Sequence, residues 1–403
     1  ISECLTLDEE NSSGYSKEFY SASEELRKQY KNDEEAKQII DIALGLEGLR
    51  RQDGIHAAAI VISPDTITKF LPIQQKGSNA EIVTQYEMHT VEQLGLLKMD
   101  FLGLRNLSIV DRTLELIGSE SLDIDNLKLD DEKTFKLFAE GKMTGVFQLE
   151  SRVAQSTSRS LKPKRFEDIV ALVALIRPGP LGAGMHNEFA DRANNRKEIE
   201  YLHNDLESIL NETYGVILYQ EQVMQIAEKI AGFNLQEADN LRVAMGKKIP
   251  KVMEEQRKKF TDGAVSNNYS EQFAIELFDQ IAYFAGYGFN KSHSVPYALL
   301  AYQTAYLKAN YPAEYIAACL TAVKRDKDRT AIFLSEARDM GVKVSTPDIN
   351  LSSSDFTVND NEILFGLSAV RNVGDITADK IVLERESNGP VSYTHLTLPT
   401  MIG

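Results

Sequence analysis

The sequence has few cysteines and no long apolar run. Two cysteines, Cys4 and Cys319, occur among 403 residues. They lie far apart without a CxxC pair, so we expect neither a zinc site nor a disulfide framework, which suits a reducing compartment. No run of about 18 apolar residues could span a membrane, and the N-terminus lacks the basic-then-apolar order of a signal peptide. We therefore predict a soluble protein of the cytoplasm with no membrane partner. Because the first residue is Ile1 and not Met, we also expect a fragment of a longer chain.

Basic residues are too few to balance the acidic ones. The chain has 44 Lys and Arg against 60 Asp and Glu, a formal net charge of -16, whereas phosphate binding normally needs a basic surface. The charge is nevertheless segregated, because basic residues outnumber acidic ones in the stretches 152–197 and 242–259. Each stretch is either a solvated helix face or a local surface for nucleic acid.

The residue pattern along the chain predicts an α+β protein that is mostly helical. Residues 1–50 have helical spacing, with Asn32 and Glu35 as a capping box at a helix start. From 54 to 105, short β-rich runs are bounded by Gly, Pro and Asn, which predicts a small mixed β-sheet. From 106 to about 340 the periodicity is mostly helical, which predicts a large helical domain.

The segment Leu96-Leu-Lys-Met-Asp-Phe-Leu is the first that suggests chemistry. In a strand, alternate residues share a face, so Lys98 and Asp100 should point one way while Leu97 and Met99 point into an apolar core. A carboxylate beside a lysine suits a Mg²⁺ ligand with a partner that neutralises phosphate, although a surface ion pair is the simpler interpretation. His56, beside three alanines, is more typical of a satisfied core residue than of a metal ligand.

Two further segments predict anion binding, although an ordinary loop capped by Asn or Ser is the alternative for the first of them. Residues Phe284-Ala-Gly-Tyr-Gly-Phe-Asn-Lys-Ser-His form a turn before a helix, whose first amides favour anions and where Asn290, Lys291, Ser292 and His293 add donors. Arg242 lies on a helix that ends near Gly246 and is followed by Lys247 and Lys248. These lysines complement the helix dipole, whereas Arg242 could reach a triphosphate. Because a triphosphate needs several donors in one place, we expect Arg242, Lys291 and His293 to converge on one basic pocket facing Asp100.

The segment Ala369-Val-Arg-Asn-Val-Gly-Asp-Ile-Thr-Ala resembles a helix-hairpin-helix, a motif that grips the nucleic-acid backbone without reading its sequence. Gly374 would open amides toward a phosphate, with Arg371 and Asn372 in the preceding turn. Asn372 stands where the motif usually has its first glycine. An ordinary hairpin of two helices is the alternative.

Seven motifs follow one another along the chain: Gly54-Ile-His-Ala-Ala, Lys98-Met-Asp-Phe-Leu-Gly-Leu, Gly145-Val-Phe-Gln-Leu-Glu-Ser, Arg177-Pro-Gly-Pro, Tyr214-Gly-Val-Ile-Leu-Tyr-Gln-Glu-Gln-Val-Met, Arg242-Val-Ala-Met-Gly-Lys-Lys and Gly286-Tyr-Gly-Phe-Asn-Lys-Ser-His-Ser. In this order they resemble the C family of replicative DNA polymerases, which includes the alpha subunit of bacterial DNA polymerase III. The palm of this family resembles that of the polymerase-β-like nucleotidyltransferases. The resemblance runs from about residue 20 to 390.

The resemblance implies a domain order and a set of site residues. Residues 1–50 would be the remainder of a helical thumb, 51–105 the second part of the palm, 106–340 the fingers and 341–390 the end of the fingers with the helix-hairpin-helix-like element. The tail 391–403 matches nothing in the family. Asp100 would be a catalytic carboxylate and metal ligand, and the nucleotide would contact Lys98, Arg242, Tyr287, Asn290, Lys291 and His293. DNA would contact Lys247, Lys248, Arg371, Asn372 and Gly374.

The implied reaction is template-directed nucleotidyl transfer, in which a primer 3′-hydroxyl attacks the α-phosphate of a deoxynucleoside triphosphate. Two Mg²⁺ ions would assist it in the complete enzyme. The implied partners are primer-template DNA and deoxynucleoside triphosphates and, in the full-length parent, a sliding clamp, a clamp loader and a proofreading exonuclease. Because the family's paired catalytic aspartates lie upstream of the thumb, we expect the isolated fragment to be inactive.

Two interpretations from other classes remain open. In the first, the chain is a noncatalytic helical DNA-binding module in which Asp100 merely pairs with Lys98. In the second, it is a protein scaffold that uses its acidic N-terminal helices and has no affinity for polynucleotides.

Overall fold

The computed structural model describes residues 1–6, 17–49, 54–75, 77, 80–118, 122–247, 250–285 and 288–390. The chain divides into two compact units, Ile1–Gly103, here called the N-terminal unit, and Leu104–Gly403, here called the helical unit. The expected tail 391–403 lies outside the described residues. Among the described residues, no helix is both long and apolar enough to cross a membrane.

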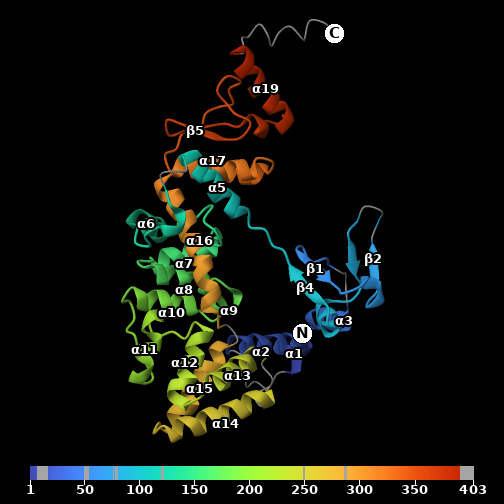
Figure 1. Ribbon diagram of the computed structural model, residues 1–403. Helices are drawn as coiled ribbons and strands as arrows, with labels where there is room; N and C mark the ends of the chain where they lie inside the picture. Colours follow the sequence, from blue (N-terminus) through green and yellow to red (C-terminus); the bar gives the residue numbers. More distant parts are fainter. Residues whose placement is uncertain are drawn as a thin grey trace. The chain divides into compact units, whose positions relative to one another are not determined.

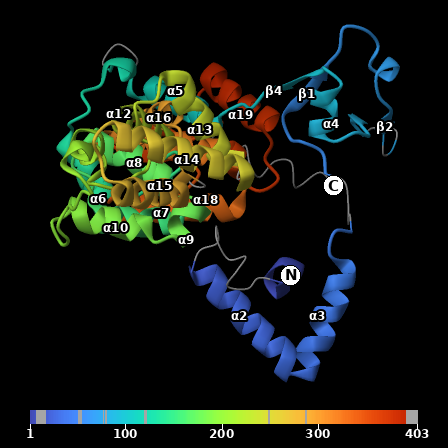
Figure 2. The same cartoon turned by 90° about the horizontal axis from the view of Figure 1, so that it is seen from below.

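The N-terminal unit begins with helices. These are α1 (Ser2–Thr6), α2 (Lys17–Asn32) and α3 (Glu34–Leu46), and Figure 2 shows α2 and α3 meeting at a sharp angle. The residue that caps α3 is Asp33, whose carboxylate accepts hydrogen bonds from the amides of Glu35 and Ala36 at 2.9 and 3.1 Å. We expected Asn32 to cap this helix, and that prediction is wrong by one position. Asn32 is the last residue of α2, and Asp33 takes the extended conformation between the helices.

The strands of the N-terminal unit form two separate antiparallel pairs. Strand β1 (Ala59–Ile62) pairs with β4 (Leu97–Asp100), and β2 (Ile73–Gln75) pairs with β3 (Ile82–Thr84). The expected β-rich segment is therefore present, but its described strands are antiparallel and do not form the single mixed sheet that we predicted. Between them lie a short 3-10 helix (Ile67–Lys69) and α4 (Met88–Gln93). A small core of Leu71, Val91 and Leu96 packs against Val61.

The helical unit contains most of the helices, as the sequence predicted. In chain order they are α5 (Arg105–Ile117), α6 (Glu132–Glu140), α7 (Arg152–Leu161), α8 (Phe166–Leu175), α9 (Pro178–Gly182), α10 (Met185–Ala193), α11 (Glu207–Leu210), α12 (Gln220–Ala231), α13 (Leu235–Lys247), α14 (Pro250–Ser266), α15 (Glu271–Ala285), α16 (Lys291–Asn310), α17 (Pro312–Val323), α18 (Lys327–Asp339) and α19 (Asp375–Asn388). Many helix starts are capped locally: the side chains of Asp131, Ser151 and Asp326 accept backbone amide hydrogen bonds at the starts of α6, α7 and α18.

Helix α16 is the central element of this unit. Between Ala298 and Leu307 the residues of α16 are mostly small or apolar, a composition that suits a buried helix. It packs along α8 and α6 and contacts α17 and α5 near its C-terminal end (Figure 1). A second apolar cluster, among α12, α13, α14 and α15, includes Leu241, Phe260 and Ile281. This cluster and the apolar core between α16 and α8 determine where the first turns of α12 and α16 lie.

The C-terminal part of the helical unit is a small hairpin followed by α19. Strands β5 (Thr357–Asn359) and β6 (Glu362–Leu364) pair antiparallel around Asp360 and Asn361, whose φ angles of 47° and 66° are left-handed, as a tight hairpin turn requires. A single 3-10 turn, Leu367–Ala369, precedes α19. We expected two short helices here, and the first of them is only this turn.

Candidate functional site

Asp100 and Lys98 lie on the same face of β4, as their spacing predicted. Lys98 Nζ donates to Asp100 Oδ1 at 2.8 Å and to Oδ2 at 3.0 Å. This hydrogen bond, more than any other contact, lowers the pKa of Asp100 below its ordinary value. The His56 Nδ1 atom lies 3.9 Å from Asp100 Oδ1 and accepts a hydrogen bond from the Ala58 amide. His56 is satisfied, but it is exposed and not part of a core as we expected.

The opposite face of β4 is not buried, which corrects the expectation of an apolar core there. Met99 is 38% exposed and Leu97 54%, whereas the side chain of Lys98 is 16% exposed. The reason is that α4 and the core around Val91 contact the side of the β1–β4 ribbon that carries Lys98 and Val61. In the described part of the N-terminal unit, nothing comparable covers Ile60, Leu97 and Met99.

The described residues do not by themselves complete a two-metal site. Asp100 offers one carboxylate, and Lys98 already engages it. Among the described residues no group of three or more His, Cys, Asp or Glu side chains is arranged to hold a metal ion. Two Mg²⁺ ions need several carboxylates to hold them, so the residues present do not fit the complete ion pair.

The helical unit brings two predicted motifs together at the starts of α12 and α16. The Phe289 amide donates to the Leu218 carbonyl at 3.1 Å, and the Gln220 amide donates to the Phe289 carbonyl at 2.9 Å. Gln220 also donates through its side chain to the Gly288 carbonyl. This short pairing places the first turn of α12 beside the first turn of α16.

The predicted nucleotide-binding residues of α13 and α16 converge on α12. Arg242 Nη1 lies 3.5 Å from Gln220 Oε1. The next residue, Glu221, accepts hydrogen bonds from the Lys291 amide at 2.9 and 3.0 Å. Arg242 and Lys291 therefore contact consecutive residues of one helix, whereas their convergence with His293 on one nucleotide pocket stays a prediction. His293 is exposed on the first turn of α16, with its ring 4.5 Å from that of Tyr297, and the remaining predicted residue, Tyr287, lies outside the described part of the chain.

The surroundings of Arg242 and Lys291 are not purely basic, unlike the basic pocket that we expected. Lys291 Nζ lies 2.7 Å from the Glu212 carboxylate, and Arg242 lies 2.8 Å from the Asp239 carboxylate. Each cation thus has an acidic partner from the same unit. Sequence reasoning missed Glu212 and Glu221, although the motif Tyr219-Gln-Glu-Gln that contains Glu221 was among the seven that it singled out.

The start of α16 already has protein acceptors for its amides. The side chain of Asn290 caps the helix by accepting from the His293 amide at 2.9 Å. The Glu221 carboxylate accepts from the amides of Lys291 and, at 3.4 Å, Ser292. The Asn290 cap matches the ordinary capped loop, and a carboxylate of the chain itself accepts from the other two amides, so anion binding at this cradle stays a prediction.

The helix-hairpin-helix-like segment has only part of the expected backbone, the turn at Asn372 and the helix that follows it. Asn372 has a φ of 67°, a left-handed conformation that Asn tolerates better than most residues, so it can stand in for the usual glycine. Gly374 is the N-cap of α19, and Ala378 is buried behind it. Arg371 is exposed in the turn. For the other predicted DNA contacts, α13 extends to Lys247, and Lys248 lies outside the described residues.

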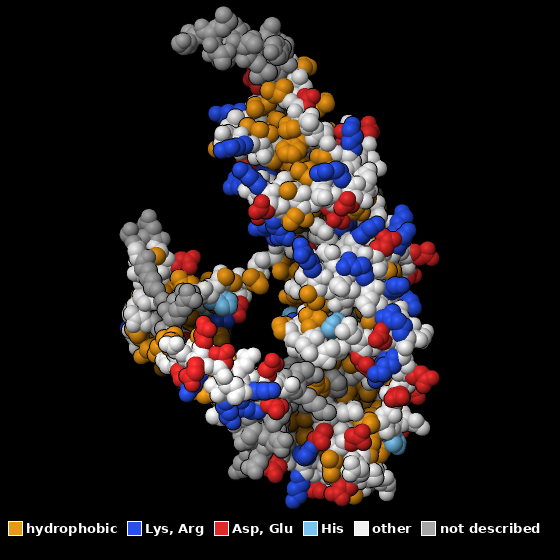
Figure 3. Space-filling view, turned by 180° about the vertical axis from the view of Figure 1, so that it is seen from behind, with side chains coloured by type: hydrophobic (Ala, Val, Ile, Leu, Met, Phe, Trp, Pro, Cys, Tyr) orange, Lys and Arg blue, Asp and Glu red, His pale blue; other side chains and the backbone are white. Residues whose placement is uncertain are grey.

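Some cations of the two basic stretches are paired with acidic side chains of the helical unit. Figure 3 shows Lys and Arg side chains interspersed with Asp and Glu side chains on the surface of the helical unit. Ion pairs account for this mixture: Arg165–Asp168, Arg192–Glu188, Arg196–Asp191, Lys197–Glu188, Arg257–Asp279 and Lys259–Glu237. The pairs of Arg196, Lys197, Arg257 and Lys259 are exposed, and exposed pairs contribute little stability, so phosphates can compete for these four cations.

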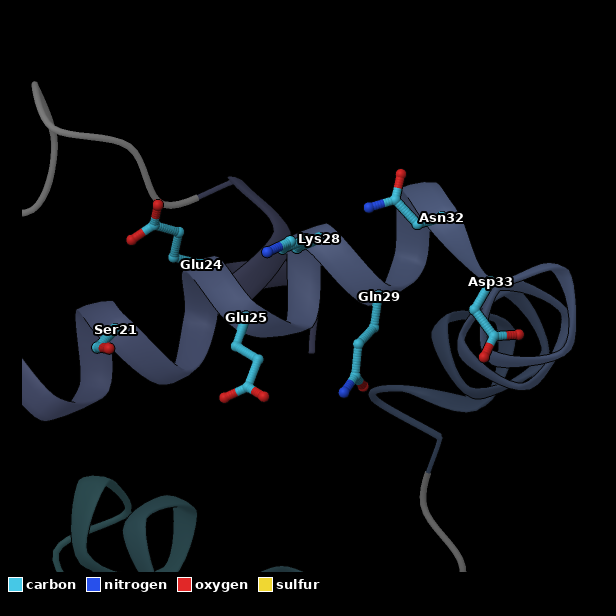
Figure 4. A pocket seen from close by; sticks show the side chains of 7 residues that line it. All are labelled: Ser21, Glu24, Glu25, Lys28, Gln29, Asn32 and Asp33. Atoms are coloured by element: carbon cyan, nitrogen blue, oxygen red, sulfur yellow. The ribbon is translucent and has the colours of Figure 1, made fainter.

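A surface hollow lies beside α2, far in sequence from the residues predicted for the site. Figure 4 shows that Glu24, Glu25 and Lys28 are among the polar side chains that line it. None of the residues that we predicted for the site is among those lining this hollow, and its charges are mixed, so we assign it no nucleotide.

Comparisons with known proteins agree with the motif order. Residues 106–268 match the family model of the bacterial DNA polymerase III alpha subunit finger domain, residues 3–103 match the bacterial DNA polymerase III alpha NTPase domain, and residues 341–396 match the helix-hairpin-helix motif. The chain is 47% identical to the DNA polymerase III subunit alpha of Thermus aquaticus over 372 residues, which cover 91% of this chain and 30% of that protein.

Two other relatives give the same result. The DNA polymerase III subunit alpha of Buchnera aphidicola is 46% identical, and that of Escherichia coli (strain K12) is 45% identical, each over 92% of this chain and 33% of the relative. The chain thus spans about a third of the length of the curated relatives that it matches. On the agreement of the two models of this subunit with these relatives, the chain belongs to the bacterial DNA polymerase III alpha subunit family.

Proposed function

We propose that this chain is part of a replicative DNA polymerase that transfers nucleotides from deoxynucleoside triphosphates to a primer 3′-hydroxyl. The observation that carries the proposal is the contact of Arg242 and Lys291 with the consecutive residues Gln220 and Glu221. Residues from three separate motifs meet there, at the starts of two helices. Helix starts and cations together are what a triphosphate needs, because several donors must neutralise it in one place.

In this proposal the helical unit holds the triphosphate. Lys291 and Arg242 would pair with its phosphate oxygens, and the exposed His293 would add a donor from the first turn of α16. These groups would stabilise the negative charge that develops on the phosphates during transfer. Asp100 would supply one carboxylate of the Mg²⁺ site, with Lys98 beside it. The remaining metal ligands would come from outside the described residues.

The same proposal assigns the DNA contacts. The amides at the start of α19, after Gly374, and the exposed Arg371 would bind the phosphate backbone, which positions DNA without reading its sequence. Basic residues of 152–197 and 242–259 would add electrostatic attraction. The complete parent would work in the cytoplasm with primer-template DNA, a sliding clamp, a clamp loader and a proofreading exonuclease.

The test is a charge reversal at Lys291. In the intact parent polymerase, Lys291→Glu should reduce the affinity for deoxynucleoside triphosphates by about tenfold or more, while the affinity for primed DNA changes much less. The matched control is Lys136→Glu, because Lys136 is an exposed lysine of α6 that lies 4.0 Å from a glutamate. An equal loss of nucleotide and DNA affinity would instead favour a noncatalytic DNA-binding module.

A further inference from the structure

The cradle at the start of α16 is filled by a carboxylate that comes from a distant part of the chain. Glu221 lies 70 positions before Lys291 and still accepts hydrogen bonds from the amides of Lys291 and Ser292. A phosphate that is to use these amides must take the place of this carboxylate. The amide of His293 is already taken by Asn290.

Glu221 does not have the position of an ordinary helix cap. Helix α16 has its own local N-cap in Asn290, so the second acceptor is an addition from another helix. Glu221 also belongs to the first turn of α12, where a negative charge is favourable for the dipole of that helix. One carboxylate therefore lies at the positive ends of both α12 and α16.

Carboxylates of the chain also neutralise the two cations beside this cradle, Lys291 and Arg242. Lys291 is paired with Glu212, whose side chain is 30% exposed, and Arg242 with Asp239, which is 41% exposed. Solvent reaches these pairs, so their net stabilisation is small. They can exchange for phosphate oxygens at low cost. A triphosphate brings more negative charge than the carboxylates that it would displace.

We propose that Glu221 is an internal counter-anion that occupies the phosphate position of the empty site and leaves it when a triphosphate binds. This inference rests on the proposed function, because it requires that the start of α16 bind triphosphate. Its consequence is that the wild-type carboxylate lowers triphosphate affinity while it stabilises the empty fold. A purely structural residue would act on both quantities in the same direction.

The experiment titrates inorganic triphosphate into the 403-residue chain by calorimetry and compares wild type with Glu221→Gln. Glutamine keeps an oxygen that can accept from the Lys291 amide but removes the charge. We expect Glu221→Gln to bind triphosphate about fivefold more tightly and to melt at a lower temperature. The matched control is Glu228→Gln, which makes the same change two turns later on α12 and should leave the affinity within about twofold.

The outcomes separate this inference from the proposed function. Unchanged or weaker binding by Glu221→Gln, in a chain whose binding is still lost with Lys291→Ala, would overturn the inference and leave the triphosphate site in place. Binding that is insensitive to Lys291→Ala would overturn the site itself. The absence of binding by both wild type and Glu221→Gln would also overturn the site. Glu212→Gln provides a second variant with the same expected direction, because it releases Lys291 Nζ.

Discussion

Lys308 on α16 is buried, and its Nζ atom lies 2.6 Å from the Glu336 carboxylate on α18. The same ammonium group donates to the carbonyl oxygens of Lys142 and Thr144 at 2.7 and 2.8 Å. Burial lowers the pKa of Lys308, and Glu336 opposes this effect. One side chain thus joins the central helix to α18 and to the loop after α6.

Removing Lys308 should therefore destabilise the helical unit. Lys308→Met leaves the carboxylate of Glu336 and two carbonyl groups without their donor, so we expect a loss of about 3 kcal/mol in the free energy of unfolding. Chemical denaturation of the purified chain measures it. The double variant Lys308→Met/Glu336→Leu should recover part of the loss, because it also removes the uncompensated charge. A double variant that is less stable than the single one would contradict this account.

The pair of Lys98 and Asp100 predicts a pH effect. Lys98 lowers the pKa of Asp100 in the folded chain, so the pair stabilises the fold above the ordinary Asp pKa of about 4 and loses that effect as the pH falls through the lowered value. Lys98→Met should raise the pKa of Asp100, as measured by carbon NMR titration. Lys69→Met is the control, because it removes the similar pair with Asp65 and should leave Asp100 unchanged.

The sequence predicted the strand at Asp100 but not which of its faces is buried. The alternation of Lys98, Met99 and Asp100 depends only on backbone geometry, so their relative orientation could be inferred. Burial depends on which element packs against the strand, and α4 lies on the side of Lys98. Hydrophobicity alone favoured the opposite side. The same limit explains the cap of α3, since Asn32 and Asp33 are both good caps and only the end of α2 decides between them.

The candidate site shows where sequence patterns stop being informative. Arg242 and Lys291 were identified from cations beside helix ends, and we expected them to converge because a triphosphate needs several donors in one place. Glu221 and Glu212 were missed because their contacts with Lys291 span 70 and 79 positions. No local pattern relates a carboxylate on one helix to the first amides of another. Such a pairing depends on the packing of α12 and α16.

The start of α19 is tied to the end of α17, which predicts that this anchor stabilises the first turns of α19. Lys324 Nζ donates to Asp375 Oδ1 at 2.5 Å and to Asp355 Oδ1 at 2.6 Å. Together with Arg325, Lys324 lowers the pKa of Asp375 to about 2. Lys324→Gln should raise this pKa and accelerate amide hydrogen exchange at Ala378, because α19 loses its anchor.

NMR titration measures the pKa of Asp375, and hydrogen exchange measures the protection of the Ala378 amide. The depressed pKa of Asp375 stabilises the contact at pH values above about 4, and this stabilisation is lost as the pH falls through about 2. Lys343→Gln is the matched control, since it breaks the exposed pair with Glu362 in the same part of the chain. Equal exchange at Ala378 in both variants would contradict the anchoring role of Lys324.

The last prediction is that the chain alone binds primed DNA weakly and does not extend it. Binding should survive because the basic stretches and the turn at Arg371 are present, and it should weaken steeply with added salt as phosphate contacts release counterions. Extension should fail because two Mg²⁺ ions need several carboxylates, and Asp100 belongs to no cluster of three possible ligands among the described residues. Primer extension with Mg²⁺ and four deoxynucleoside triphosphates, run beside a salt-titrated binding assay, tests both parts. Extension above background that is abolished by Asp100→Asn would mean that other acids, such as Glu92 or Asp111, complete the site.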